Sequence, residues 1–209
     1  MTNILILGAS GQIARWVVKM FGQDTSVNQT LLVRDASKVD APANARVVQG
    51  DVLDKRLLED IMTGQDVIYA NLAGDVDKQA EAIISAMRSA GVNHLIFVTS
   101  LGIYDEVPGE FGAWNRREIG SYLPPYRRAA DAIEASGLDY AILRPAWLMD
   151  TDEVSYETTE RREPFKGTEV SRKSVAALVA KLIADGTPLG NRNLGVSKPG
   201  TDGKKPSFI

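Results

Sequence analysis

The chain has 209 residues, of which 44% are hydrophobic and 24% charged, and its formal net charge is −3. That length and composition suffice for one domain with a substantial core. The near balance of charge argues against a nucleic acid as the main partner, since phosphate binding calls for a basic surplus on one face. Because the sequence has no cysteine, disulfides, thiolate nucleophiles and cysteine-ligated metals are excluded.

The single histidine, His94, restricts two further kinds of site. One histidine cannot build a histidine-rich metal centre, so we predict no metal site. A Ser-His-Asp hydrolase would have to use His94 as its base. His94 opens an apolar run, however, which places it at the start of a strand and away from the carboxyl end, where parallel sheets carry their chemistry.

The ends and the hydropathy of the chain predict a cytoplasmic protein. The first strand pattern begins at Asn3, which leaves no room ahead of it for a targeting segment. No stretch approaches the roughly 18 to 20 consecutive apolar residues of a membrane span, so we expect no membrane partner.

Short apolar runs alternate with helical patterns along the chain. The runs are rich in Val, Ile and Leu, which is typical of strands in a parallel sheet that is covered on both faces. The predicted strands are Ile4–Leu7, Leu31–Val33, Arg46–Val48, Val67–Tyr69, Leu95–Val98 and Tyr140–Leu143, and a last strand is expected within Asn193–Pro199.

Apolar residues at helical spacing predict a helix between most of these strands. Gly137 and Gly186 are suited to end the last two helices, and Ser171 is suited to cap the final one. The helical patterns are Ile13 with Val17 and Phe21, Leu57 with Ile61, Ile83 with Met87, Pro125–Ser136 and Ser171–Asp185.

The alternation predicts an α/β fold with a doubly wound parallel sheet of the Rossmann type, as a single domain over residues 1–209. The second crossover, between Val33 and Arg46, has room for one helical turn at most. Two polar stretches, Gly102–Leu123 and Trp147–Thr168, interrupt the alternation. We interpret both as long loops that form a small substrate lobe or lid, because each follows a strand at the carboxyl edge of the sheet.

A glycine-rich turn, Gly8–Ala14, lies between the first strand and the first helix. Gly8 permits the tight turn, Gly11 lets the backbone approach a pyrophosphate, and the small Ala14 allows the helix to pack on the strand. The strand before and the helix after the turn supply the context that this motif requires. The turn therefore predicts a dinucleotide cofactor.

The end of the second strand bears on which cofactor binds. Arg34 directly follows the apolar run, where a guanidinium can hold a 2′-phosphate, and Lys38 could add charge. This favours NADP over NAD. A shift of one residue would place Asp35 there instead and restore the NAD interpretation.

The remaining strand ends complete the predicted cofactor site. Asp51 either meets the adenine or serves as a turn residue, and small residues after the fourth strand suit the middle of the cofactor. The predicted cofactor contacts are Gly8, Ser10, Gly11, Gln12, Ile13, Arg34, Asp51, Val52, Asn71, Leu72, Ala73, Thr99, Ser100 and Pro145. Tyr104, Trp114 and Trp147 are candidate walls of a substrate pocket, since they could stack on a flat ring.

Five segments carry a family resemblance: Gly8–Ala14, Val33–Asp35, Gly50–Asp51, His94–Ser100 and Ser136–Pro145. Together they resemble the atypical short-chain dehydrogenase/reductase family, and within it the NAD(P)H-binding, NmrA-like branch that also contains flavin and biliverdin reductases. The resemblance covers nearly the whole chain. It implies the fold and the cofactor more specifically than it implies the reaction.

The resemblance also implies a catalytic Ser, and a Tyr followed by a Lys four residues later. Ser100 and Tyr126 match, but position 130 is Ala. The Lys of the family lowers the pKa of the Tyr, and Arg127 and Arg128 lie on other helix faces. We therefore expect an incomplete Ser-Tyr-Lys set, with Ser100 and Tyr126 as the catalytic candidates.

Three functions follow from these features. The favoured one is an NADP(H)-dependent oxidoreductase that reduces a planar acceptor such as a flavin or quinone, because stacking orients the reactants and solvent can supply the proton. The alternative is a non-catalytic, NmrA-like regulatory protein that senses NADP(H). A nucleotide-sugar epimerase is least favoured, since it needs the full catalytic set and a larger C-terminal lobe. We expect a monomer or a homodimer.

Overall fold

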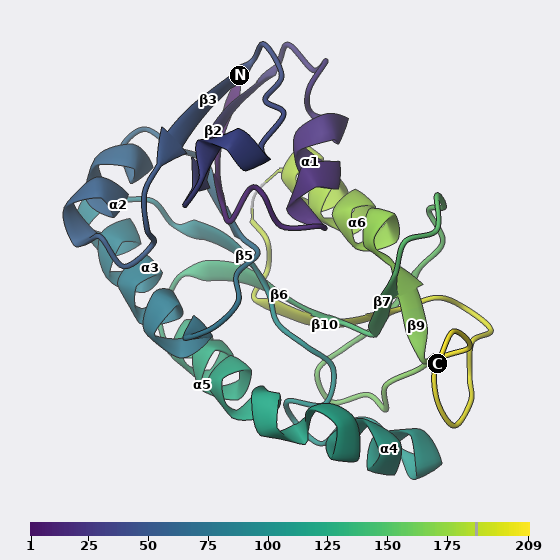
Figure 1. Cartoon of the computed structure of the whole chain (residues 1–209). Helices are drawn as coiled ribbons and strands as arrows, with labels where there is room; N and C mark the ends of the chain where they lie inside the picture. Colours follow the sequence, from purple (N-terminus) through teal and green to yellow (C-terminus); the bar gives the residue numbers. More distant parts are fainter. Residues whose placement is uncertain (187) are drawn as a thin grey trace.

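A computed structural model describes residues 1–186 and 188–209 of the chain, and its centre is an eight-stranded sheet (Figure 1). The strand order is β3-β2-β1-β4-β5-β6-β10-β8, and every neighbouring pair is parallel except β10 with β8. The strands are β1 (Thr2–Leu7), β2 (Val27–Val33), β3 (Ala45–Gln49), β4 (Val67–Ala70), β5 (His94–Val98), β6 (Asp139–Pro145), β8 (Glu157–Thr159) and β10 (Arg192–Ser197). This order confirms the predicted doubly wound sheet of a single α/β domain.

Helices cover both faces of the sheet (Figure 1). One face packs against α1 (Ala14–Met20) and α6 (Arg172–Ala184), and the other against α2 (Lys55–Met62), α3 (Val76–Ala90) and α5 (Leu123–Glu134). In β1, Ile4 and Ile6 point into the first core and Leu5 and Leu7 into the second. Successive side chains of a strand face opposite sides, so a strand buried on both faces is an uninterrupted apolar run.

The signals at both ends of α6 are confirmed, whereas α5 ends at Glu134, two residues before the predicted Ser136. The Ser171 side chain caps α6 by accepting a hydrogen bond from the Ser174 N–H. Gly137 and Gly186 adopt φ of 76° and 78°, the left-handed region that glycine enters without a Cβ penalty. The second crossover holds a single 3₁₀ turn, η1 (Ala36–Lys38), as the shortness of that segment predicted.

The prediction of two long loops was wrong in part. Gly102–Leu123 contains a helix, α4 (Gly109–Ile119), followed by the turn η2 (Gly120–Tyr122). A Cβ on Gly112, within α4, would lie 2.0 Å from the Val107 carbonyl oxygen, so close packing accounts for this glycine. Trp147–Thr168 contains β7 (Trp147–Met149), which pairs with β9 (Glu169–Ser171), and also β8.

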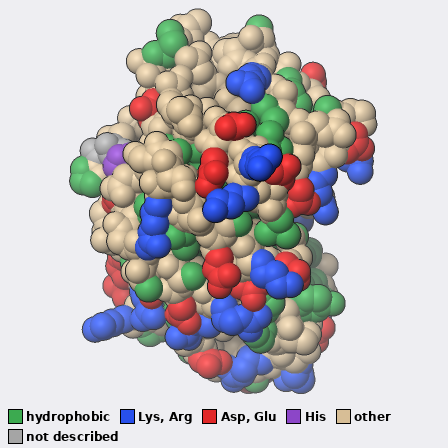
Figure 2. All heavy atoms as spheres, turned by 90° about the vertical axis from the view of Figure 1, so that its left-hand side faces the viewer, with side chains coloured by type: hydrophobic (Ala, Val, Ile, Leu, Met, Phe, Trp, Pro, Cys, Tyr) green, Lys and Arg blue, Asp and Glu red, His purple; other side chains and the backbone are tan. Residues whose placement is uncertain are grey.

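The outer surface on the side of α2 and α3 carries charges of both signs. Figure 2 shows Lys and Arg side chains interspersed with Asp and Glu there. Mixed charge of this kind agrees with the nearly neutral composition. Within the described ranges, none of the helices has both the length and the apolar composition needed to traverse a bilayer.

Candidate functional site

Two hollows open at the carboxyl edge of the sheet. The first, the glycine-turn groove, has a volume of about 260 Å³ and follows the ends of β1, β2, β3 and β4. The second, the Ser100 hollow, has a volume of about 400 Å³ and follows the ends of β5 and β6. Since β4 and β5 are neighbours in the sheet, the two hollows succeed one another along its edge.

The glycine-turn groove brings together nine of the predicted cofactor contacts. They are Gly8, Ser10, Gly11, Arg34, Asp51, Val52, Asn71, Leu72 and Ala73, and the groove is completed by Leu32, Val33, Gly50 and Gln79. Each of these residues except Gln79 lies at the end of a strand or just after it. The parallel sheet alone therefore brings them together at one edge.

The glycines of the turn are required by the close approach of Asn71. Gly8 has φ of 78°, and a Cβ there would lie 2.4 Å from the Asn71 carbonyl oxygen. A Cβ on Gly11 would lie 2.7 Å from the Asn71 side-chain nitrogen. The turn after β1 is thus packed directly on the chain after β4, and its backbone forms the floor of the groove.

Arg34 and Asp35 have different surroundings. Arg34 is exposed and lines the groove. The Asp35 carboxylate accepts hydrogen bonds from the Ser37 N–H at 3.0 Å and the Ser37 hydroxyl at 2.7 Å. These bonds with Ser37 hold the pKa of Asp35 below its ordinary value. Asp35 therefore caps the turn η1, while Arg34 faces the groove.

Two more cations lie beside the glycine turn. Arg15 and Lys38 line a larger hollow, of about 930 Å³, that adjoins the turn at Ala9. The Arg15 guanidinium donates a hydrogen bond to the Lys38 carbonyl oxygen at 3.4 Å, which ties α1 to the turn η1. Arg15 was not among the predicted site residues, although its place four residues after Gly11 was a usable signal.

The Ser100 hollow is lined mainly by apolar and aromatic side chains. Its lining includes the predicted residues Thr99, Ser100, Pro145 and Trp147, together with Leu101, Ile119, Ala146, Leu148, Arg172 and Phe208. The Trp147 indole donates to the Asn115 side-chain oxygen at 2.9 Å and packs on Trp114, with ring centroids 4.7 Å apart. Trp114 thus supports this wall through Trp147.

Six of these residues were not selected from the sequence. Leu101, Ala146 and Leu148 directly adjoin selected residues, whereas Ile119, Arg172 and Phe208 come from other parts of the chain. Ile119 lies at the end of α4, Arg172 begins α6, and Phe208 belongs to the C-terminal segment after β10. A hydrogen bond fixes this C-terminal segment to β9, because the Ser207 N–H donates to the Glu169 carboxylate at 2.6 Å. Only Arg172 had a local signal, its position directly after the capping Ser171.

Tyr126 lies at the boundary of the groove. Its hydroxyl is 3.5 Å from the Leu72 carbonyl oxygen, and burial raises the pKa of this phenol. Ala130 is fully buried in the same core cluster, which agrees with the shared helix face expected from the spacing. Arg127 binds Asp131 and Arg128 binds Asp77, so the neighbouring cations are engaged elsewhere.

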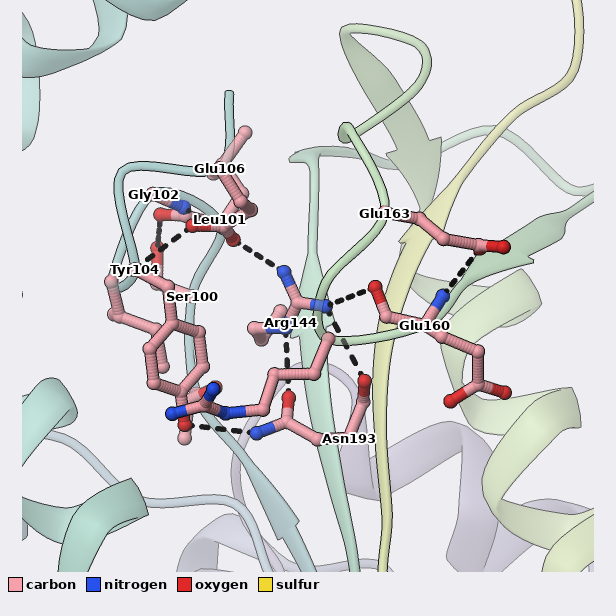
Figure 3. A network of polar contacts seen from close by, with 12 residues as sticks. Ser100, Leu101, Gly102, Tyr104, Glu106, Arg144, Glu160, Glu163 and Asn193 are labelled. Carbon is pink, nitrogen blue, oxygen red and sulfur yellow. Dashed lines mark hydrogen bonds and ion pairs between the residues drawn. The ribbon is translucent and has the colours of Figure 1, made fainter. Parts of the chain in front are cut away.

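Tyr104 belongs to a polar network (Figure 3). Its hydroxyl donates to Glu134 at 3.2 Å and accepts from the Asn193 amide at 2.8 Å, and the Arg161 guanidinium lies 4.2 Å from its ring centroid. Tyr104 was predicted as a wall of the substrate pocket. It lies outside the lining of the Ser100 hollow and contacts the Arg161 guanidinium and the Asn193 amide instead.

The same network holds a buried ion pair between Arg144 and Glu106 (Figure 3). The Glu106 carboxylate also accepts from the Gly102 and Tyr104 N–H groups, at 3.0 and 2.9 Å. Arg144 also donates to Asn193 at 2.8 Å. The network therefore fixes the loop that follows Ser100 to β6 and β10.

Two predicted contacts lie on the α1 side of the turn. Gln12 is exposed and lines a shallow depression with Arg15 and Trp16. Ile13 is buried, and its backbone forms the N-terminal boundary of α1. Its side chain serves the core, so only its main chain is available to a ligand.

A model of the NAD(P)H-binding family matches residues 8–186, which is most of the chain. The chain belongs to this family. The match includes the glycine turn, the strand ends of the groove and the start of α6. It confirms the resemblance noted from the sequence at the level of the family.

Solved structures support the same assignment. A Rossmann-fold NAD(P)-binding family protein from Shigella flexneri is 50% identical, with a TM-score of 0.86 and complete coverage of both chains. A short-chain dehydrogenase/reductase from Veillonella parvula in complex with NADP is 27% identical, with a TM-score of 0.90 and 99% coverage of each chain.

A curated relative carries the name of an activity. An NAD(P)H azoreductase from Xenophilus azovorans is 29% identical over 154 residues, which is 70% of this chain and 48% of the relative. The chain thus spans about half the length of that relative.

Proposed function

We propose that the protein is an NADP(H)-dependent reductase that passes a hydride to a planar acceptor such as a flavin or a quinone. The observation that carries this proposal is the Ser100 hollow, a largely apolar space with an aromatic wall beside the glycine-turn groove. Its volume, about 400 Å³, lies within the range of small-molecule sites.

The residues of the glycine-turn groove fit a dinucleotide. The main chain of Gly8, Ser10 and Gly11, continued by Gln12 and Ile13, would hold the pyrophosphate. Asp51 and Val52 would border the adenine, and Asn71, Leu72 and Ala73 the middle of the cofactor. Thr99, Ser100 and Pro145 would border the nicotinamide.

Electrostatics support NADP over NAD in this proposal. Arg34 faces the groove, Arg15 and Lys38 lie near it, and the carboxylate that would compete for a ribose hydroxyl, Asp35, is bound to Ser37. A guanidinium binds a phosphate with charge-assisted hydrogen bonds, and neighbouring cations strengthen that attraction.

A planar acceptor also suits the catalytic groups that the chain has. The cofactor supplies a hydride when bound, and a conjugated ring takes it up without a protein acid, since a proton from water completes the reduction. Trp147 offers a face for stacking. The Ser100 hydroxyl donates to the Leu101 carbonyl oxygen at 3.2 Å and would donate to a polar atom of the acceptor on rotating away from that oxygen. Tyr126 lacks a lysine four residues on, so its proposed part is to hold the groove at Leu72.

The azoreductase relative supports a conjugated acceptor, because an azo group is a planar unsaturated system. The epimerase interpretation gains nothing from the hollow, which offers mainly apolar contacts where a sugar would need many polar ones.

The proposal is tested by binding and turnover together. The cofactor-free protein is titrated with NADPH and NADH by calorimetry, and nucleotide oxidation is then followed by absorbance with menadione and with FMN as acceptors. We expect tighter binding of NADPH and acceptor-dependent oxidation. Absence of binding for both nucleotides would contradict the cofactor site.

The sensing function is a second candidate, and the buried Ala130 in place of a lysine is the observation that favours it. A sensor would bind NADPH and NADP⁺ with different affinities and would oxidise NADPH with none of the acceptors. If NADPH is oxidised faster with the protein than in the same mixture without it, the protein is a reductase.

A further inference from the structure

Among the described residues that line the Ser100 hollow, Arg172 is the one that carries a charge. Its side chain is only 17% exposed, and it shares the lining with the apolar side chains of Leu148, Trp147 and Phe208. A guanidinium in such surroundings has lost most of its water, so its N–H groups need acceptors from the protein or from a ligand.

The protein supplies hydrogen-bond acceptors for only some of the N–H groups of this guanidinium. Nη1 donates to the Leu148 carbonyl oxygen at 3.3 Å and pairs with Asp150 at 3.0 Å. Nε is buried and has no hydrogen-bond partner within the described part of the chain. The edge formed by Nε and Nη2 is the one that binds a carboxylate through two parallel hydrogen bonds.

The existing partner of Arg172, Asp150, lies mostly in solvent. The Asp150 side chain is 73% exposed, so water solvates its carboxylate when the pair opens. Solvent on that side screens the attraction within the pair, so another carboxylate can compete with Asp150. Nε is closed off from solvent while the pair is formed, so a ligand carboxylate would reach the unpaired edge only when the guanidinium turns away from Asp150.

We propose that Arg172 selects planar acceptors that carry a carboxylate on the ring system. The ring packs against Trp147 and Phe208, and the carboxylate binds the Nε–Nη2 edge of Arg172 in place of Asp150. The inference rests on the reductase function proposed above and specifies its substrate class. Burial of a cation with one unsatisfied N–H group beside an apolar wall is the feature that favours an anionic group on an otherwise apolar ligand.

The test measures binding in the absence of turnover. The complex of the protein with NADP⁺ is titrated by calorimetry with naphthalene-2-carboxylate and with naphthalene-2-carboxamide, which has nearly the same shape and no charge. Arg172→Gln, Arg172→Lys and Asp150→Asn are compared with the natural chain. Lys173→Gln is the matched control, because it removes one neighbouring charge that pairs with Asp152 and lies outside the hollow lining.

We expect the natural chain to prefer the carboxylate, and Arg172→Gln to weaken carboxylate binding roughly 10- to 100-fold, the value of a hydrogen-bonded charge. The same substitution should change the affinity for the carboxamide much less. Arg172→Lys should restore only part of the affinity, since an ammonium lacks the planar fork. Asp150→Asn should strengthen carboxylate binding, because it removes the competing anion, and Lys173→Gln should leave the preference unchanged.

Three results would overturn the inference. The carboxylate preference could be the same in Arg172→Gln as in the natural chain. Asp150→Asn could weaken both probes and lower the melting temperature, which would make the ion pair a purely structural link. The complex could also bind neither probe. A failure of the reductase function is distinguishable, because it shows as absent oxidation of NADPH with menadione while the carboxylate preference persists.

Discussion

The glycine-turn groove and the Ser100 hollow lie at the same edge of one sheet, but they are built in different ways. The groove is made of short segments that end β1 to β4, and much of its surface is main chain. The hollow is made of side chains from five separate places, including the end of α4, the start of α6 and the C-terminal segment. Changes in the hollow can therefore alter ligand preference while the sheet and the groove persist.

The largest effect on stability is expected at the buried ion pair, whose two residues lie outside the lining of both hollows. Arg144 is fully buried and Glu106 is 5% exposed, so Arg144→Met leaves a carboxylate in the interior without its cation. We expect the free energy of unfolding to fall by about 3–5 kcal/mol, measured by urea denaturation. The double variant Arg144→Met/Glu106→Gln should recover part of this loss. An unchanged denaturation midpoint in the single variant would show that the pair is not needed for stability.

The next largest effect is expected at Gly8. Comparing Gly8→Ala with Gly64→Ala separates the cost of a left-handed backbone from the cost of a steric clash with Asn71. Gly8 and Gly64 both have positive φ, 78° and 77°, but only a Cβ at Gly8 would meet another part of the chain, the Asn71 oxygen at 2.4 Å. We expect Gly8→Ala and Gly64→Ala each to cost about 1–2 kcal/mol of stability from the left-handed backbone.

Only Gly8→Ala should also abolish NADPH binding, because the turn must move away from Asn71. Calorimetric titration of both variants measures this difference. Equal NADPH affinity in the two variants would mean that the floor of the groove is not shaped by that contact.

A smaller effect is expected at the rim of the groove. Arg34→Ala should weaken NADPH binding about ten-fold and leave NADH binding nearly unchanged, because only NADPH carries the 2′-phosphate. The difference should shrink at high salt, since Arg34 is exposed.

Asp35→Ala is the control for that variant. The Asp35 carboxylate is bound to Ser37, so its removal should not weaken NADH binding. A loss of NADH affinity in Asp35→Ala would instead favour the NAD interpretation.

The smallest effect, on the turnover number, is expected from a substitution at Tyr126. A general acid contributes roughly 100-fold or more to a rate, whereas Tyr126→Phe should change the turnover number less than about two-fold. Burial raises the pKa of Tyr126, so the phenol stays protonated up to and beyond its ordinary range. The pH profile of turnover below that range should therefore be the same in both proteins. A descending limb that the phenylalanine variant lacks would identify Tyr126 as a proton donor.

The sequence alone predicted the fold well, for reasons visible in particular elements. β1 is buried on both faces and so reads as an uninterrupted apolar run, and the helix ends at Gly137 and Gly186 use conformations that glycine adopts readily. α4 escaped prediction, because Gly109 and Gly112 resemble turn formers until the Val107 backbone is seen beside Gly112.

The sequence by itself determined the composition of the groove, since strand ends that are parallel neighbours must meet at one edge, and nine predicted residues do so. Only the tertiary structure decided which side chains line the Ser100 hollow. It also decided that Arg34 faces the groove, that Asp35 binds Ser37 and that Tyr104 joins the polar network. The physical reason is sequence distance. Thr99, Trp147, Arg172 and Phe208 are brought together by packing between elements, and no local pattern records such contacts.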